Sequence, residues 1–363
     1  MTDSTRPSIL IMMPTKHIGD LLISMKTIET INQSGNYGRC LLVADDRYRN
    51  LLEMSASTTP TLFYPRSKLT AGSWLSRLGT FRQFIGELRS HKYDIAIDLD
   101  GTILSSRLTR LCKARHKIGP HFSKRPGVYQ QLVDVDTVNL HKHCDYTSML
   151  KPLGIADPGS GYQQLHSPVD LPALANKLQQ PVLLNDCHKV ACLHVGATKA
   201  YKQWGEEKFA ALADQILEQG WLCIFIGAGK IDRCSIDAIV EKMQHKHHSQ
   251  LIDSCNRLNL QELVRLLERA DIYIGNDSGP MHLSAATGTL TLGLFGPTDN
   301  RRWSPMGEYA RVIRGSEPCA SDCKRSVCSQ NYRCMRSLSV ENVLGYFPEQ
   351  IQSAGGESLN PAP

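Results

Sequence analysis

The sequence contains no long hydrophobic run. Nowhere in its 363 residues does a segment approach the roughly 20 apolar residues that a membrane-spanning helix needs. Residues 1–8 are polar, and no signal-peptide core precedes Ile9. We therefore expect a cytoplasmic protein. In that compartment the 12 cysteines are predicted to be reduced thiols rather than a disulfide framework.

Two further patterns are missing, and each absence argues against a class of function. The sequence has no long Lys/Arg run interleaved with aromatic residues and no helix-turn-helix or zinc-finger spacing, so we predict no nucleic-acid partner. No predicted strand is followed by a complete Gly-x-Gly-x-x-Gly, which disfavours a dinucleotide-dependent oxidoreductase.

The composition is that of a soluble globular protein with a mild basic bias. Hydrophobic residues make up 41% and charged residues 21% of the chain, and its length favours two domains, each with its own core. The 41 Lys and Arg exceed the 35 Asp and Glu, giving a net charge of +6. Such a balance suits acidic partners such as nucleotides, phosphorylated glycans or an anionic membrane surface.

Short apolar runs alternate with stretches of helical spacing along most of the chain. The first series includes the runs at residues 8–14, 40–44 and 93–99, and a second series begins at residue 189. This alternation predicts parallel sheets covered by helices. The fold class is therefore predicted to be α/β, with two Rossmann-like domains facing one another across an interdomain cleft, the natural place for a ligand.

Proline and glycine accumulate between about residues 157 and 181 and mark a domain junction. We expect this linker to carry a short strand of its own. The predicted division is listed here: a first domain at residues 1–165, a linker at 166–185, a second domain at 186–340, and a terminal helix and flexible tail at 341–363.

The most informative stretch is Gly-Asn-Asp-Ser-Gly-Pro-Met-His at residues 275–282. It follows a short apolar run and precedes small and apolar residues at helical spacing, so it reads as a strand, a turn and a helix start. Unpaired backbone N–H groups and the dipole at such a helix start favour an anion. Ser278 and Gly279 allow the main chain to approach a phosphate. The alternative interpretation, a capped loop without a ligand, stays open for this motif taken alone.

Three other features fall at predicted strand ends. Lys202 follows the turn after residue 194 and would neutralise a diphosphate, and Asp232 follows a Gly-Ala-Gly turn at a distance suited to ribose hydroxyls. In the first half, Asp20 follows a turn where a carboxylate can act as a base, although a helix cap is the more common role. Together they predict a nucleotide in the second half and a base from the first.

These motifs give the chain a resemblance to a known family. It resembles the heptosyltransferases of bacterial lipopolysaccharide core synthesis, inverting glycosyltransferases of the GT-B fold. The resemblance runs from Ile18-Gly19-Asp20 through residues 93–99 to Lys202-x-Trp204 and residues 227–229. It is strongest across residues 275–282 and 294–298.

The resemblance implies a role for individual residues. Asp20 matches the carboxylate that deprotonates the acceptor hydroxyl. The residues implied to bind the ADP-heptose donor are Thr198, Lys202, Asp232, Leu258, Asp277, Ser278, Gly279 and His282. The family usually has Glu where Asp232 stands, so its reach to the ribose is shorter. No cofactor or divalent metal is required.

The resemblance also implies an acceptor and a location. The implied acceptor is the lipid-anchored inner core of lipopolysaccharide. The protein is expected to reach it by peripheral association with the cytoplasmic face of the inner membrane of a Gram-negative bacterium. Lys124 and Arg125 belong to a basic cluster that is a weak candidate for acceptor binding, and a solvated loop is the alternative. In the family's architecture the first domain binds the acceptor and the second binds the nucleotide sugar.

Four cysteines cluster near the end of the second domain. Cys319, Cys323, Cys328 and Cys334 place four thiols within sixteen residues, a loop at 319–334. Such thiols can hold zinc or iron, although the spacing lacks the paired Cys-x2-Cys of common zinc sites. We favour a loop of reduced thiols and predict no metal, with a structural metal as the alternative.

Overall fold

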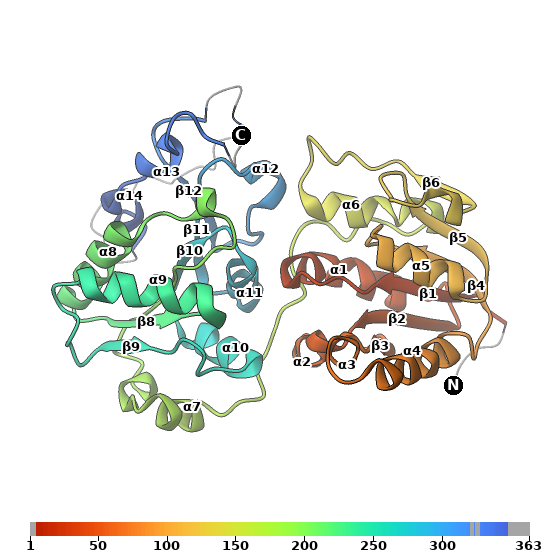
Figure 1. Cartoon of the computed structure of the whole chain (residues 1–363), viewed down its shortest axis with the longest axis horizontal. Coiled ribbons are helices and arrows are strands. Elements are labelled where there is room, and N and C mark those ends of the chain that lie inside the picture. Colours follow the sequence, from red (N-terminus) through yellow and green to blue (C-terminus); the bar gives the residue numbers. More distant parts are fainter. Residues whose placement is uncertain (1–4, 320–322, 324–326, 348–363) are drawn as a thin grey trace. The chain divides into compact units, whose positions relative to one another are not determined.

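The computed structural model describes residues 5–319, 323 and 327–347, which form two compact units (Figure 1). Unit 1 ends at His166 and unit 2 begins at Ser167. Each unit contains its own six-stranded sheet, and every strand pairing in both sheets is parallel. The α/β class with two parallel sheets, predicted from the alternation of apolar runs, is therefore confirmed.

Unit 1 orders its strands β3-β2-β1-β4-β5-β6. Its strands are β1 (Ser8–Met13), β2 (Arg39–Asp45), β3 (Thr61–Tyr64), β4 (Tyr93–Asp98), β5 (Ala114–Pro120) and β6 (Gln131–Val133). Its helices are α1 (Ile18–Gln33), α2 (Arg49–Met54), α3 (Arg66–Thr70), α4 (Trp74–Leu88), α5 (Ile103–Leu111) and α6 (Lys142–Ser148).

Unit 2 orders its strands β12-β11-β10-β7-β8-β9. Its strands are β7 (Val190–His194), β8 (Leu222–Ile226), β9 (Leu251–Asp253), β10 (Ile272–Asn276), β11 (Leu290–Phe295) and β12 (Ala310–Arg314). Its helices are α7 (Leu171–Leu178), α8 (Glu206–Glu218), α9 (Gly229–Lys242), α10 (Leu260–Arg269), α11 (Gly279–Thr287), α12 (Asn300–Trp303), α13 (Arg333–Arg336) and α14 (Val340–Leu344).

Both sheets therefore share the strand order 3-2-1-4-5-6 when each unit is counted from its own first strand. The chain leaves the first strand toward one edge of the sheet and the fourth strand toward the other. Because parallel crossovers are right-handed, the two sets of helices cover opposite faces. The turns after the first and fourth strands diverge, which opens a crevice at the carboxyl ends of those strands. In this protein the two places are β1 beside β4 and β7 beside β10.

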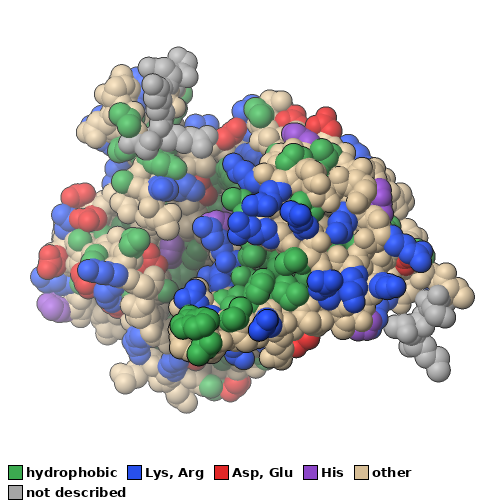
Figure 2. Space-filling view, turned by 45° about the vertical axis from the view of Figure 1, so that its right-hand side comes forward, with side chains coloured by type: hydrophobic (Ala, Val, Ile, Leu, Met, Phe, Trp, Pro, Cys, Tyr) green, Lys and Arg blue, Asp and Glu red, His purple; other side chains and the backbone are tan. Residues whose placement is uncertain are grey.

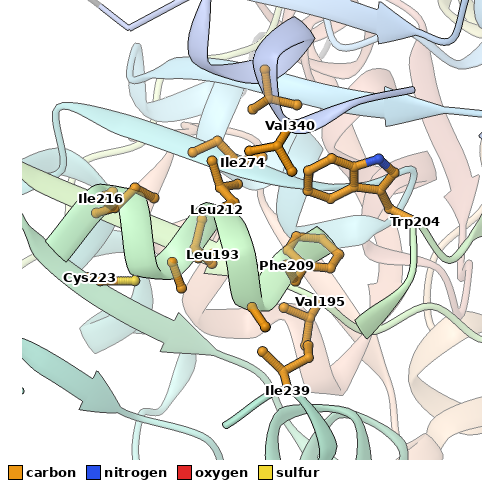
Figure 3. Packing of buried hydrophobic residues seen from close by; sticks show 14 of the residues in the cluster. Leu193, Val195, Trp204, Phe209, Leu212, Ile216, Cys223, Ile239, Ile274 and Val340 are labelled. Atoms are coloured by element: carbon orange, nitrogen blue, oxygen red, sulfur yellow. The ribbon is translucent and has the colours of Figure 1, made fainter. Parts of the chain in front are cut away.

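The core of unit 2 explains why its strands read as continuous apolar runs. All five residues of β8 are buried, as expected for a parallel strand covered on both faces. On one face, side chains of α8, α9 and α14 pack against β7, β8 and β10 (Figure 3). The Trp204 ring meets Phe209 edge-on with centroids 5.0 Å apart. In unit 1, Phe84 of α4 and Leu108 of α5 lie in one cluster with Leu10 and Met12 of β1.

Some elements differ from the sequence-based prediction. The short strand expected in the linker is wrong, because that segment forms the helix α7, with Pro172 in its first turn where a missing N–H costs nothing. The prediction also missed the short strands β3, β6 and β12. Residues 116–119, which the sequence pattern suggested to be a loop and strand edge, lie inside β5, between β4 and β6. The predicted tail beyond residue 347 lies outside the described residues.

One glycine of the second sheet is required by close packing. A Cβ on Gly275 of β10 would lie 2.9 Å from the backbone carbonyl oxygen of His194 in the neighbouring strand and would also contact the Tyr273 hydroxyl. We expect Gly275→Ala to lower the free energy of unfolding by about 1–3 kcal/mol, the usual cost of overpacking. Urea denaturation measures this change.

The matched control is Gly79→Ala on the exposed surface of α4, where a Cβ meets no atom within 4 Å. That change is expected to raise the free energy of unfolding by about 0.5–1 kcal/mol, because alanine is the better helix former. Equal effects of the two substitutions would contradict the packing argument.

Candidate functional site

The turn between β10 and α11 presents backbone N–H groups at the carboxyl edge of the second sheet. Ser278 occupies the N-cap position in an extended conformation, and α11 begins at Gly279 with Pro280 in its first turn. The first N–H groups of a helix have no partner inside the helix, and the helix dipole makes this end electropositive. The local geometry predicted for residues 275–282 is present, and it suits an anion such as phosphate.

Lys202 lies directly at this turn. Its Nζ is 2.7 Å from Asp277 Oδ2 and 3.4 Å from the Asp277 carbonyl oxygen. Asp277 is buried, whereas the lysine side chain is partly exposed. Two of the predicted donor-binding side chains are thus brought together although 75 residues separate them. The pair places one cation and one carboxylate next to the start of α11.

Asn276 holds the two loops of this site together. Its side chain donates to the Val195 carbonyl oxygen at 2.7 Å and accepts from the Trp204 backbone N–H at 3.1 Å. The amide is fully buried, so losing either partner would leave a polar group unpaired. This fixes the segment that carries Lys202 against the end of β10. Asn276 belongs to the motif at residues 275–282, but its role was not predicted from the sequence.

His194 connects the turn between β10 and α11 to Asp232. Its Nδ1 is 3.1 Å from the Ser278 hydroxyl and its Nε2 is 3.4 Å from Asp232 Oδ2. The imidazole is buried at the end of β7. The sequence analysis recorded His194 only as the start of a turn, because the residues it contacts come from α9 and from the β10–α11 turn.

Asp232 sits in a cradle formed by two glycines. A Cβ on Gly196 or Gly227 would collide with its side chain, so only glycine leaves room for the carboxyl group there. The carboxylate accepts from the backbone N–H of Ala228 at 2.8 Å. Burial opposes its ionisation, but the His194 and Ala228 hydrogen bonds outweigh burial and lower the pKa of Asp232. The side chain is directed at its own turn, and its contact with a ribose stays a prediction.

The remaining predicted donor residues lie along the same edge of unit 2. Thr198 is exposed in the loop after β7, and Leu258 is half-buried in the loop between β9 and α10. Gly279 is the first residue of α11. His282 is buried one turn further along that helix. Their contacts with a donor stay predictions.

Unit 1 has a cavity of about 530 Å³ at the carboxyl edge of its sheet, and Asp20 lines it. Asp20 lies in the first turn of α1, just after β1. Its Oδ1 is buried and has no hydrogen-bond partner among the described residues. The Tyr146 side chain is buried nearby, and burial, followed by the charges of Asp20, Asp100 and Asp145, holds the pKa of Tyr146 well above its usual value. The phenol stays neutral, and Oδ1 of Asp20 is available to take a proton.

Cations surround the same cavity. Lys142 of α6 is held by an ion pair of 2.8 Å with Asp145 and lies over the rings of Tyr146 and Phe122. Arg66 of α3 pairs with the fully buried Asp45 and donates to the Pro14 carbonyl oxygen at 2.9 Å. Neither residue was identified from the sequence, because neither follows a recognisable strand–turn motif. They give the cavity a charge suited to an anionic ligand.

A second carboxyl group, Asp100, lines the cavity with Asp20. Behind it, the fully buried Asp98 accepts from the Tyr129 hydroxyl at 2.6 Å and from the Gly101 backbone N–H at 2.9 Å, which fixes the turn after β4. Burial, and then the charges of Asp98 and Asp20, raise the pKa of Asp100 to about 7. Asp100 was not predicted from the sequence as a site residue.

The two weak acceptor candidates differ in position. Lys124 lines the cavity together with Asp20, whereas Arg125 is not among the lining residues. Two neighbouring basic residues bond to strand and loop atoms: His121 Nδ1 accepts from the Val135 backbone N–H, and Lys117 Nζ donates to the Arg110 carbonyl oxygen.

The cysteine cluster is partly described. Cys319 Sγ lies 3.8 Å from Cys334 Sγ, and the Tyr332 backbone N–H donates to Cys328 Sγ at 3.3 Å. Burial, together with the neighbouring Cys323 and Cys334 thiols, raises the pKa of Cys319 to about 12. Within the described residues no group of three or more His, Cys, Asp or Glu side chains is arranged to hold a metal ion.

Comparison with known proteins decides the family. The family described as glycosyltransferase family 9 (heptosyltransferase) matches residues 81–333, well over half of the chain. The chain belongs to this family. The resemblance recognised from the motifs around Asp20, Lys202 and residues 275–282 is therefore confirmed.

Individual members of glycosyltransferase family 9 are distant from this chain. Lipooligosaccharide heptosyltransferase 2 of Campylobacter jejuni is 29% identical over 170 residues, which cover 46% of this chain and 53% of that protein. Lipopolysaccharide heptosyltransferase 3 of Escherichia coli K12 is 24% identical over 300 residues, covering 81% of this chain and 84% of that one. The first two curated relatives are matched over only 53% and 64% of their length.

Solved structures of the family share the fold. A family 9 glycosyltransferase from Veillonella parvula has a TM-score of 0.80 at 20% identity, with 96% of this chain and 98% of that chain covered. An E. coli heptosyltransferase solved with ADP has a TM-score of 0.69 at 19% identity, covering 94% and 99%. The GT-B fold class is thus confirmed. Among the described residues of this family member, no helix is long and apolar enough to cross a membrane.

The raised pKa of Asp100 predicts a pH-dependent stability. The folded carboxyl group keeps a proton that the unfolded chain releases above its ordinary pKa of 3.8. Its contribution is therefore largest below that value and is lost as pH rises toward about 7. Between these two pH values the parent protein should lose stability on the order of 4 kcal/mol, and Asp100→Asn should remove this loss, as measured by urea denaturation at a series of pH values.

The control for this prediction is Asp134→Asn, which changes a fully exposed carboxylate in the same unit. It should leave the pH dependence of the parent protein nearly intact. An unchanged slope in the Asp100→Asn protein would show that the Asp100 carboxyl does not hold its proton in the fold.

Proposed function

We propose that this chain is an inverting glycosyltransferase that transfers heptose from ADP-heptose to the inner core of lipopolysaccharide. The reaction takes place at the cytoplasmic face of the inner membrane, where the lipid-anchored acceptor is met by peripheral contact. Family membership sets the class of reaction, and a nucleotide-sugar donor follows from the site in unit 2. The observation that carries the proposal is the Lys202–Asp277 pair beside the start of α11.

The donor half of the proposal rests on charge. A nucleoside diphosphate is the leaving group, and negative charge grows on it as the glycosidic bond breaks. The backbone N–H groups at the start of α11 and the Lys202 ammonium meet that charge without reorganising, because Asn276 and His194 already fix their loops. Asp277 then holds sugar hydroxyls. The fold shared with a heptosyltransferase solved with ADP supports this donor class.

The acceptor half rests on Asp20. Inversion by direct displacement needs one base that takes the proton of the attacking hydroxyl. The unpartnered Oδ1 of Asp20 in the unit 1 cavity, which Tyr146 also lines, supplies such an atom. Lys142, Arg66 and Lys124 suit the phosphate or carboxylate groups of an inner-core acceptor. No step of this mechanism calls for a divalent metal, so transfer is expected to persist in the presence of a chelator.

Two other functions remain as outcomes to be tested. A related transferase that uses another nucleotide sugar or glycan acceptor would share the phosphate contacts and differ around Asp277 and His282. A non-catalytic protein that binds nucleotides or glycans on the same fold would bind without turnover. Calorimetry with ADP, UDP and GDP is the first test, and tighter binding of UDP or GDP than of ADP would overturn the assignment of ADP-heptose as donor.

Lys202 is predicted to contribute a charged contact to the diphosphate. Removing a charge-assisted hydrogen bond in a partly buried site costs roughly 1.5–3 kcal/mol, so Lys202→Ala should weaken ADP binding about 10- to 100-fold in calorimetry. The matched control is Lys189→Ala, since Lys189 also forms an ion pair in unit 2, 2.9 Å from Asp271, at the opposite edge of the sheet. Equal affinities in the two variants would remove Lys202 from the donor site.

Asp20 is predicted to be the catalytic base. Asp20→Asn keeps the size of the side chain and removes its ability to accept a proton, so kcat should fall by roughly 10²- to 10⁴-fold while ADP affinity stays unchanged. A transfer assay with ADP-heptose and a core acceptor, run beside calorimetry, checks both values. Unchanged turnover would exclude Asp20 as the base, and absence of turnover in the parent protein would favour the binding-protein alternative.

A further inference from the structure

Large hydrophobic side chains are exposed near the cavity of unit 1. Trp74, Leu75 and Leu78 in the first turns of α4 are 71%, 62% and 44% exposed, and Ile103 at the start of α5 is 48% exposed. Ile103 also lines the cavity that contains Asp20. Single exposed apolar residues are common on protein surfaces, but a group of this size at one edge of a sheet points to an interaction.

The fold places these residues at the same edge. Residues 66–74 follow the carboxyl end of β3, and α4 then runs back to the amino end of β4. The helix α5 starts from the carboxyl end of β4. Phe84 and Leu108 join both helices to one cluster on one face of the sheet. Trp74 and Ile103 therefore both stand at the carboxyl edge, where the cavity opens.

Two segments of this region contain basic and no acidic residues, although Asp46 accepts a hydrogen bond from the Ser67 backbone N–H at the start of α3. Residues 54–86 contain four Lys or Arg and no Asp or Glu, and residues 101–133 contain seven Lys or Arg and again no acid. Exposed members of these segments include Lys68, Arg77, Arg82, Arg107 and Lys124. Figure 2 shows a hydrophobic patch bordered by Lys and Arg side chains on the face that it brings forward. The net charge of the whole chain is only +6, so this segregation is local.

We propose that the carboxyl edge of unit 1, from α3 and the start of α4 to the start of α5, docks on an anionic lipid bilayer. Trp74, Leu75 and Leu78 enter the headgroup region while the surrounding Lys and Arg bind lipid phosphates. This inference rests on the proposed function, because a lipid-anchored acceptor must reach Asp20. Docking beside the cavity brings the acceptor sugar to the base without removing its lipid anchor from the membrane.

The chemistry of the surface favours a bilayer over a protein partner. Tryptophan prefers the membrane–water interface, where its apolar ring and polar N–H are both satisfied. An apolar strip bordered by Lys and Arg is typical of segments that lie in the membrane surface. Protein–protein interfaces are usually depleted in lysine. This surface is instead rich in Lys and Arg, and residues 54–86 and 101–133 contain no Asp or Glu to pair with them.

The test measures sedimentation of the full chain with vesicles. Vesicles of phosphatidylglycerol and phosphatidylethanolamine are compared with vesicles of phosphatidylcholine alone. Binding should require the anionic lipid and should weaken with salt, since each Lys or Arg near an anionic surface contributes roughly fivefold in affinity. Equal sedimentation with both vesicles, or none with either, overturns the proposal.

Two sets of variants distinguish vesicle binding through this surface from nonspecific hydrophobic binding. Trp74→Ser/Leu75→Ser/Leu78→Ser should lower affinity for the anionic vesicles by at least about tenfold, from the lost apolar area. The matched control is Leu184→Ser/Tyr309→Ser/Val327→Ser, which changes three exposed hydrophobic residues of unit 2. Both sets alter exposed side chains, and unchanged thermal unfolding confirms that each variant is folded. Equal loss in the two sets overturns the assignment of the surface.

Calorimetry distinguishes failure of this inference from failure of the proposed function. If the triple variant of α4 still binds ADP and transfers to a water-soluble acceptor while its vesicle binding is lost, the docking surface is established apart from the chemistry. If the parent protein binds ADP and the α4 variant binds vesicles as well as the parent does, the docking surface is wrong and the proposed function stands. A parent protein that binds no ADP would overturn the function instead.

Discussion

The reversal of strand order beside the first strand of each sheet determines where chemistry can occur in this protein. Right-handed crossovers leave β1 and β4, or β7 and β10, toward opposite edges, so the turns at their carboxyl ends separate. Helix dipoles and unpaired N–H groups gather there, while the rest of each sheet is covered by apolar packing. Asp20, Asp100, Lys202 and Ser278 all follow strands at these two places.

Buried polar groups behind these turns hold the loops that carry the exposed functional side chains. Asn276 and His194 in unit 2, and Asp98 in unit 1 through the Tyr129 hydroxyl, are buried and hydrogen-bonded to segments from distant parts of the chain. Such buried networks hold the turns in one conformation, because leaving any member unpaired is costly. Unit 2 can therefore present Lys202, and unit 1 the carboxylate of Asp20, with little local rearrangement. The same rigidity explains the narrow tolerance around Asp232, where Gly196 and Gly227 leave no room for a side chain.

Lys and Arg residues are concentrated in certain segments of unit 1. Their role differs from that of the buried hydrogen-bond networks. The long acid-free stretches of unit 1 give a cationic edge around a cavity that itself holds the carboxyl groups of Asp20 and Asp100. In the proposed function, the basic residues attract an anionic acceptor at a distance, and the Asp20 carboxylate takes a proton at contact. Both effects depend on α3, α4 and α5 meeting at one edge of the sheet, which links the packing of Phe84 and Leu108 to function.

The sequence by itself determined the α/β class, most of the strands, the family, and the placement of Asp20, Lys202 and Ser278 at strand ends, because each depends on local patterns of a few residues. Short strands with half-buried or alternating residues, such as β3 and β12, lacked such a pattern. The helix α7 was not predicted because Pro172 in its first turn was interpreted as part of a linker. The tertiary structure alone decided that Arg66, Lys142 and Tyr146 share a cavity with Asp20, and that His194 contacts Asp232. Those contacts follow from sheet order and register, which bring together residues that no local spacing connects.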